Sequence, residues 1–81
     1  MARIIQATNA RDFFRLVNTL PDDPGPNYDG KCDLFKKVTN PRGPIIAPVC
    51  RGTCATGHCR QALTVRRQGR GVIIRVTCEC S

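Results

Sequence analysis

Six cysteines in a chain of 81 residues constrain the fold more than any other feature of the sequence. They are Cys32, Cys50, Cys54, Cys59, Cys78 and Cys80. A chain this short buries a modest share of its surface, so a hydrophobic core alone gives marginal stability. Small domains usually add disulfides, a metal or a partner chain. Because an even number of cysteines favours disulfides, we predict a small disulfide-rich domain from an oxidising compartment.

The spacing of the cysteines restricts how they can pair. Cys78 and Cys80 lie two residues apart on a predicted strand, so their side chains leave the same face and are poor partners for each other. Cys50 and Cys54 are the nearest pair with a similar spacing. Joining Cys50 to Cys78 and Cys54 to Cys80 would close a small covalent ring.

The N-terminal segment has the period of an amphipathic helix. Its apolar residues Ala10, Phe13, Phe14, Val17 and Leu20 fall at helical spacing. Thr8 or Asn9 can cap the start, and Pro21 can stop the helix. We expect the apolar face with Phe13, Phe14 and Val17 to pack on its own domain or on a second copy. Residues 21–31 have the composition of a linker, which divides the chain into a helical arm and linker (1–31) and a cysteine-bearing domain (32–81).

The cysteine-bearing part is predicted to form two β-hairpins. Residues 33–49 hold apolar runs on either side of a turn at 40–43, and Pro44 and Pro48 make the returning strand an edge strand or an irregular one. Residues 62–67 and 72–80 alternate apolar and polar side chains on either side of a Gly-rich turn at 68–71, in which Gly69 and Gly71 are expected to supply positive φ angles. Two-stranded ribbons are marginal in water, so the disulfides should tie them at the base.

The order Cys50-x-Gly52-x-Cys54 followed by Cys78-x-Cys80 resembles the cystine-knot growth factor and hormone superfamily, and the spacing is closest to the platelet-derived and vascular endothelial growth factor type. The resemblance covers residues 32–81. It implies an all-β cystine knot with two hairpin fingers, here following an N-terminal helical arm. The implied ring bonds are Cys50–Cys78 and Cys54–Cys80, with Gly52 as the ring glycine and Cys32–Cys59 as the bond that threads the ring. With no seventh cysteine, a homodimer would be non-covalent.

The excess of positive over negative charge lies entirely in the cysteine-bearing part. The net charge is +7, and residues 32–81 carry nine basic and two acidic side chains. This excess favours anionic partners, among them glycosaminoglycans and acidic receptor surfaces. The predicted contact residues lie at the finger ends: Asn40, Pro41, Arg42, Arg66, Arg67 and Arg70. We expect no nucleic-acid binding because stacking aromatics are scarce, and no membrane insertion because no stretch is long and apolar enough.

The resemblance implies a secreted, non-enzymatic ligand of growth factor, hormone or antagonist type that binds a receptor or other protein through its fingers. No catalytic triad or paired carboxylates are visible in the sequence, and no cofactor is expected. Secretion would require a leader removed before Met1, since residues 1–14 contain no apolar signal core. One alternative is a secreted cationic defence or toxin peptide that acts on anionic membranes. Another is a small intracellular zinc module, with ligands drawn from Cys50, Cys54, His58, Cys59, Cys78 and Cys80.

Overall fold

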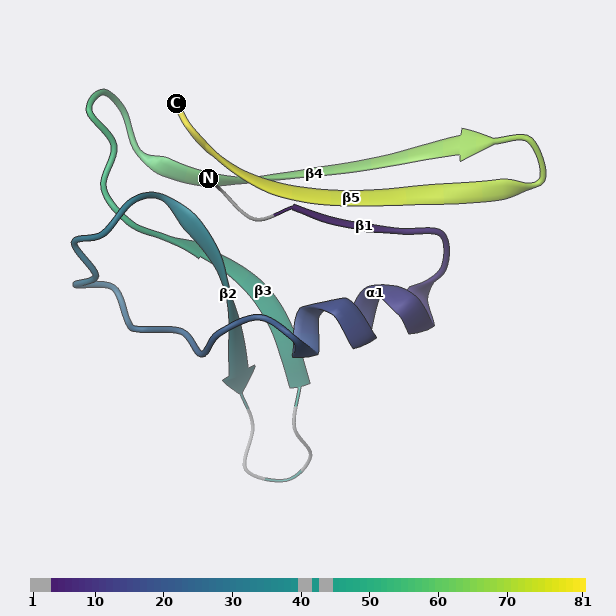
Figure 1. Ribbon diagram of the computed structural model, residues 1–81, viewed down its shortest axis with the longest axis horizontal. Coiled ribbons are helices and arrows are strands. Elements are labelled where there is room, and N and C mark those ends of the chain that lie inside the picture. Colours follow the sequence, from purple (N-terminus) through teal and green to yellow (C-terminus); the bar gives the residue numbers. More distant parts are fainter. Residues whose placement is uncertain (1–3, 40–41, 43–44) are drawn as a thin grey trace.

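Strands form most of the regular structure, in two antiparallel sheets (Figure 1). The structure is a computed structural model that describes residues 4–39, 42 and 45–81. The elements in chain order are β1 (Ile5–Ala7), α1 (Ala10–Asn18), β2 (Asp33–Thr39), β3 (Ile45–Arg51), β4 (Cys59–Gln68) and β5 (Gly71–Cys80). The chain is therefore a small, mostly β protein with three disulfides, in agreement with the predicted disulfide-rich β class.

The larger sheet has the strand order β1-β5-β4. Strands β4 and β5 form the second predicted hairpin, paired from Cys59 opposite Cys80 to Gln68 opposite Gly71. The turn has Gly69 at φ +61°, a conformation that glycine adopts without strain. Gly71 has no positive φ, so that expectation was wrong: it starts β5 instead of forming the turn. Strand β1 adds to the other edge of β5, an element that the sequence did not predict.

The smaller sheet is the first predicted hairpin, β2 paired with β3. Pro48 lies opposite Lys36. The Lys36 N–H donates to the Pro21 carbonyl and the Lys36 carbonyl accepts from the Asp23 N–H, both at 2.9 Å. The backbone of Lys36 thus faces away from β3, and the missing N–H of Pro48 leaves no gap in the ladder. Pro44 lies outside the described residues.

Helix α1 brings the N-terminal segment into the same core as the cysteine-bearing part. Asn9 caps the helix, since its Oδ1 accepts from the Asp12 N–H at 2.8 Å. The core cluster comes from four elements and the turn after α1; it consists of Ile5, Val17, Leu20, Leu34 and Val76. Residues 4–31 are therefore packed against the 32–81 part and are not a free arm.

The two hairpins leave the disulfide-bonded end of the molecule in different directions (Figure 1). The β4–β5 hairpin runs along the longest axis of the molecule, with α1 beneath it, and the β2–β3 hairpin diverges from it (Figure 1). The molecule is flat as a result, with extents of 40 × 34 × 16 Å. The ends of the two hairpins are consequently separate surfaces.

Candidate functional site

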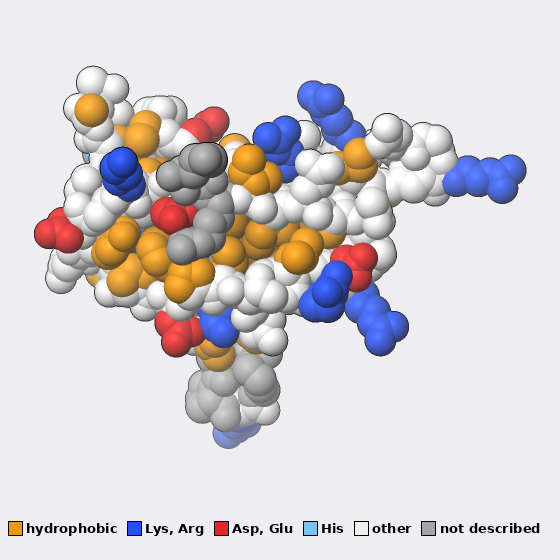
Figure 2. Space-filling view, in the orientation of Figure 1, with side chains coloured by type: hydrophobic (Ala, Val, Ile, Leu, Met, Phe, Trp, Pro, Cys, Tyr) orange, Lys and Arg blue, Asp and Glu red, His pale blue; other side chains and the backbone are white. Residues whose placement is uncertain are grey.

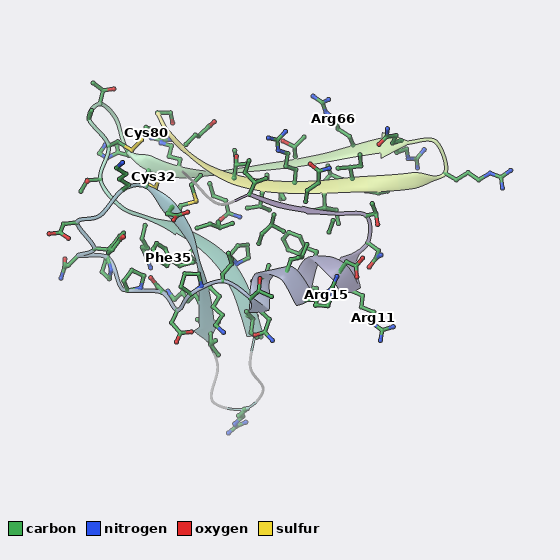
Figure 3. The ribbon with its side chains drawn as sticks, viewed as in Figure 1. Arg11, Arg15, Cys32, Phe35, Arg66 and Cys80 are labelled. Carbon is green, nitrogen blue, oxygen red and sulfur yellow. A yellow bond between two sulfur atoms is a disulfide. The ribbon has the colours of Figure 1, made fainter. Side chains whose placement is uncertain are left out.

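Three disulfides join the two hairpins at one end of the molecule. They connect Cys32 to Cys59, Cys50 to Cys78 and Cys54 to Cys80, the pairs that the resemblance implies. Each bond links the first-hairpin part of the chain to the second, over 26 to 28 residues. Figure 3 shows Cys32 and Cys80 close together at this end, where β2 begins and β5 finishes. The bonded cysteines thus form a shared base.

The sulfur atoms of the Cys32–Cys59 bond lie beside two different disulfides. The Cys32 sulfur is within 4.8 Å of the sulfurs of Cys54 and Cys80. The Cys59 sulfur is within 4.8 Å of those of Cys50 and Cys78. The Cys50–Cys78 and Cys54–Cys80 bonds close a covalent ring from residues 50–54 and 78–80. The third bond therefore bridges the space between the two bonds of that ring.

Gly52 lies in the ring segment, next to the backbone of residues 31 and 32. Its φ is +133°, and a Cβ at this position would lie 2.5 Å from the backbone atoms of Lys31 and Cys32. The Thr53 N–H next to it donates to the Gly30 carbonyl at 2.8 Å. Only glycine satisfies both the conformation and the close approach.

The structure has the three expected cysteine pairs but a different arrangement of the strands that carry Cys50 and Cys78. Cys50 lies on β3 and Cys78 on β5, but these strands belong to different sheets and share no ladder. The pairing of Cys50 with Cys78 therefore does not place them on adjacent strands of one sheet, although their i, i+2 and i, i+4 spacings favoured such partners. Side-chain packing brings Cys50 and Cys78 together, since both contact the hydrophobic core.

The cysteine sulfurs are grouped closely enough to resemble metal ligands, but they are oxidised. Both groups of three belong entirely to disulfide-bonded cysteines, and all six cysteines are among the described residues. Zinc binds cysteine as a thiolate. His58 lies apart from these groups, exposed, with its backbone paired to Ser81. In this state the cluster offers covalent support and no thiolate ligand.

An ion pair fixes the 21–31 segment, whose composition predicted a linker. The Arg51 guanidinium donates to both carboxylate oxygens of Asp23, at 2.8 and 3.1 Å, and the Gly25 N–H donates at 2.9 Å. The hydrogen bond from Arg51, followed by that from Gly25, lowers the pKa of Asp23 from 3.8 to about 2. Residues 21–31 are thereby attached to β3 near the disulfide base.

The arginines of the β4–β5 hairpin fall on different faces of the sheet. Arg66 lies opposite Ile73, and Arg67 opposite Val72, so their side chains leave opposite faces. Arg70 is in the turn at the hairpin end. All three are exposed, and Figure 2 shows basic side chains protruding along this hairpin. Figure 3 shows Arg66 pointing away from α1.

Two apolar side chains of β4 are exposed beside these arginines. Leu63 and Val65 are each 61% exposed, although their partners on β5 are shielded: Val76 is fully buried and Ile74 is half-buried. They leave the face that the core uses, but β1 pairs with β5 and not with β4, and α1 packs mainly on β1, β3 and β2. Figure 2 shows apolar side chains gathered between the long hairpin and α1. This part of the sheet is an uncovered continuation of the core face.

The remaining predicted residues are placed as follows. At the first hairpin end Arg42 is an exposed turn residue, whereas Asn40 and Pro41 lie outside the described residues. Val17 is fully buried in the core. Phe13 packs against the core and meets Phe14 edge-on, with ring centroids 5.8 Å apart. Phe14 itself is 56% exposed, so the helix face is covered on one side only.

Comparisons of this chain with protein-family models, with curated proteins and with solved structures gave no match. In the part of the chain that the structure describes, α1 is too short to cross a lipid bilayer. What the chain does must therefore be argued from its own geometry.

Proposed function

We propose that this chain is a secreted, non-enzymatic cystine-knot ligand of the growth factor, hormone or antagonist type. The observation that carries the proposal is the position of the Cys32–Cys59 bond. Its two sulfurs lie beside different disulfides of the 50–54/78–80 ring, the arrangement expected of a bond that passes through the ring. The close approach of residues 31 and 32 to Gly52 supports the same threading.

The proposed mechanism is presentation of two hairpin ends from a covalently fixed base. A pre-organised surface loses less conformational entropy on binding than a flexible one. The contact surface we assign to a protein receptor comprises Arg42 on the first hairpin and Arg66, Arg67 and Arg70 on the second. Their guanidinium groups suit an acidic receptor surface, for which they provide both long-range attraction and directional hydrogen bonds.

The proposal is tested by binding of the oxidised protein to arrayed receptor ectodomains. We expect saturable binding to an ectodomain, lost on reversing the charge of the second-hairpin arginines (Arg66→Glu, Arg67→Glu and Arg70→Glu together). The matched control reverses three basic residues away from the hairpin ends: Arg11→Glu, Arg15→Glu and Lys31→Glu. Unchanged binding of the hairpin variant, or equal loss in both variants, would overturn the contact assignment. A disulfide map that departs from the three pairs would overturn the knot.

A second candidate is a cationic peptide that acts on anionic membranes. Leu63 and Val65 are exposed beside Arg66 and Arg67, so one hairpin carries apolar and basic side chains together. Dye-loaded vesicles of phosphatidylglycerol separate the two functions. Leakage without ectodomain binding supports the membrane activity, whereas ectodomain binding with sealed vesicles supports the ligand.

A further inference from the structure

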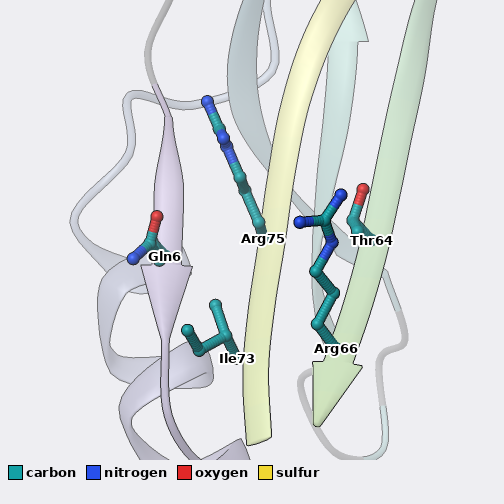
Figure 4. A pocket seen from close by; sticks show the side chains of 5 residues that line it. All are labelled: Gln6, Thr64, Arg66, Ile73 and Arg75. Atoms are coloured by element: carbon teal, nitrogen blue, oxygen red, sulfur yellow. The ribbon is translucent and has the colours of Figure 1, made fainter. Parts of the chain in front are cut away.

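A small cavity lies on the face of the three-stranded sheet opposite to the core. Its volume is about 230 Å³, and it is lined by Gln6, Thr64, Arg66, Ile73 and Arg75. Figure 4 shows these side chains on three adjacent strands, with the Arg66 guanidinium between β4 and β5 and Arg75 extending towards β1. Arg75 on the central strand has Gln6 on one side and Thr64 on the other. The cavity therefore depends on the docking of β1, which the sequence did not predict.

Two arginines line the cavity, and neither has an acidic partner among the described residues. Arg66 lies opposite Ile73, so Arg75 is its diagonal neighbour on the same face. Among the described residues, the ion pairs involve Arg15, Lys36 and Arg51, and neither cavity arginine. Residues 59–78 contain five arginines and no acidic residue. Because like charges on one face repel, an anion placed between the two guanidinium groups would stabilise this arrangement.

The other lining groups indicate what carries the anion. Two planar guanidinium forks suit the oxygens of a sulfate or phosphate group. The Gln6 amide and the Thr64 hydroxyl can donate to and accept from hydroxyl groups beside that anion. Ile73 supplies a small apolar surface on which a sugar ring can pack. These groups together match a sulfated saccharide.

The phosphate of a lipid head group could also bind the two arginines, but the surface around the cavity does not suit a membrane. The exposed apolar residues of this hairpin, Leu63 and Val65, leave the opposite face of the sheet. A membrane that placed its phosphates in the cavity would therefore contact the polar face, where insertion has little apolar surface to bury.

We propose that this cavity is a binding site for the sulfate group of a sulfated saccharide, held by Arg66 and Arg75 and bordered by Gln6 and Thr64. The site goes beyond the proposed receptor contact, because it extends across one face of all three strands, from Gln6 on β1 through Arg75 on β5 to Thr64 on β4. It shares Arg66 with that surface, whereas Arg75 belongs to the cavity alone.

The test is a titration of ¹⁵N-labelled protein with a sulfated hexasaccharide at constant ionic strength, with the desulfated hexasaccharide as the control ligand. We expect saturable shifts of the Nε–H signals of Arg66 and Arg75 with the sulfated form only. Arg66→Gln and Arg75→Gln should each weaken binding about tenfold, the loss of one charge-assisted interaction. Arg67→Gln removes the same charge from the same strand but on the opposite face, and should leave the affinity nearly unchanged.

Three results would overturn the site. Equal weakening by Arg67→Gln and Arg75→Gln would show diffuse attraction to the whole hairpin. Absence of saturable shifts at Arg66 and Arg75 would show that the cavity stays empty. Stronger binding to phosphatidic acid vesicles than to the hexasaccharide would assign the anion to lipid. An Arg75→Gln variant that loses the saccharide but keeps ectodomain binding separates this proposal from the receptor contact.

Discussion

At Gly52 two independent constraints meet, a positive φ and a neighbouring backbone. Gly52→Ala would set its Cβ 2.5 Å from atoms of Lys31 and Cys32, none of which belongs to a flexible side chain. We expect a severalfold lower yield of correctly paired protein in oxidative refolding, measured by chromatography and disulfide mapping. Gly69→Ala is the control, because Gly69 also has a positive φ but a Cβ added there would meet no atom within 4 Å. It should cost about 1–2 kcal/mol and leave pairing intact. Equal yields from the two variants would contradict the close approach.

The Asp23–Arg51 pair predicts an acid-sensitive part of the stability. The folded state lowers the pKa of Asp23 from 3.8 to about 2, so the pair stabilises the fold above about pH 4 and this contribution disappears as the pH falls towards 2. Because both side chains retain some solvent contact, we expect about 1 kcal/mol, or several degrees in the unfolding midpoint. Asp23→Asn should lower the midpoint at neutral pH and flatten its fall between about pH 5 and pH 2 in thermal unfolding.

Asp22→Asn provides the matched control for this pH dependence. Asp22 is the preceding residue, but its side chain is 88% exposed and its contact with Lys36 is 3.7 Å long. Its substitution should leave both the midpoint and the acid slope close to those of the wild type. If Asp22→Asn flattens the slope as much as Asp23→Asn, general charge explains the effect and not the pair.

Among the elements, α1 offers the simplest test of local stabilisation. Asn9→Ala removes the hydrogen bond from the Asp12 N–H to the Asn9 side chain, which satisfies one free donor of the first turn. The expected loss is about 1 kcal/mol in the free energy of unfolding by guanidinium chloride. Asn18→Ala at the other end of the same helix should have a smaller effect, since Asn18 contributes its backbone carbonyl to Lys36. A larger loss from Asn18→Ala would be inconsistent with the capping role.

The elements also show which parts of the structure can be predicted from sequence. Both hairpins and α1 follow from local signals: turn residues between alternating strands, and an apolar period after a capping residue. Strand β1 has only three residues, too few for a period, and its pairing with β5 comes from burial of Ile5 and Ala7 in the core. The cavity next to Arg75 was therefore invisible in the sequence, because Gln6 reaches it only through that pairing. The three cysteine pairs could be predicted because the order Cys50-x-Gly52-x-Cys54 followed by Cys78-x-Cys80 resembles that of the cystine-knot superfamily.

For the molecule as a whole, the balance between the core and the disulfides can be measured bond by bond. The three bonds span 27, 28 and 26 residues, so the chain-entropy contribution is about 3.5 kcal/mol for each and does not distinguish them. The surroundings of the three bonds do distinguish them.

Cys50 and Cys78 pack against the core cluster, whereas Cys80 is exposed. Replacing Cys50 and Cys78 with alanine removes packing as well as a cross-link. We therefore expect that pair to lose about 1–3 kcal/mol more stability than the Cys54→Ala, Cys80→Ala pair in guanidinium chloride unfolding. Equal losses would mean that the disulfides act through the unfolded chain alone. A greater loss for the exposed pair would show that the end of β5, and not the core, limits the stability of the base.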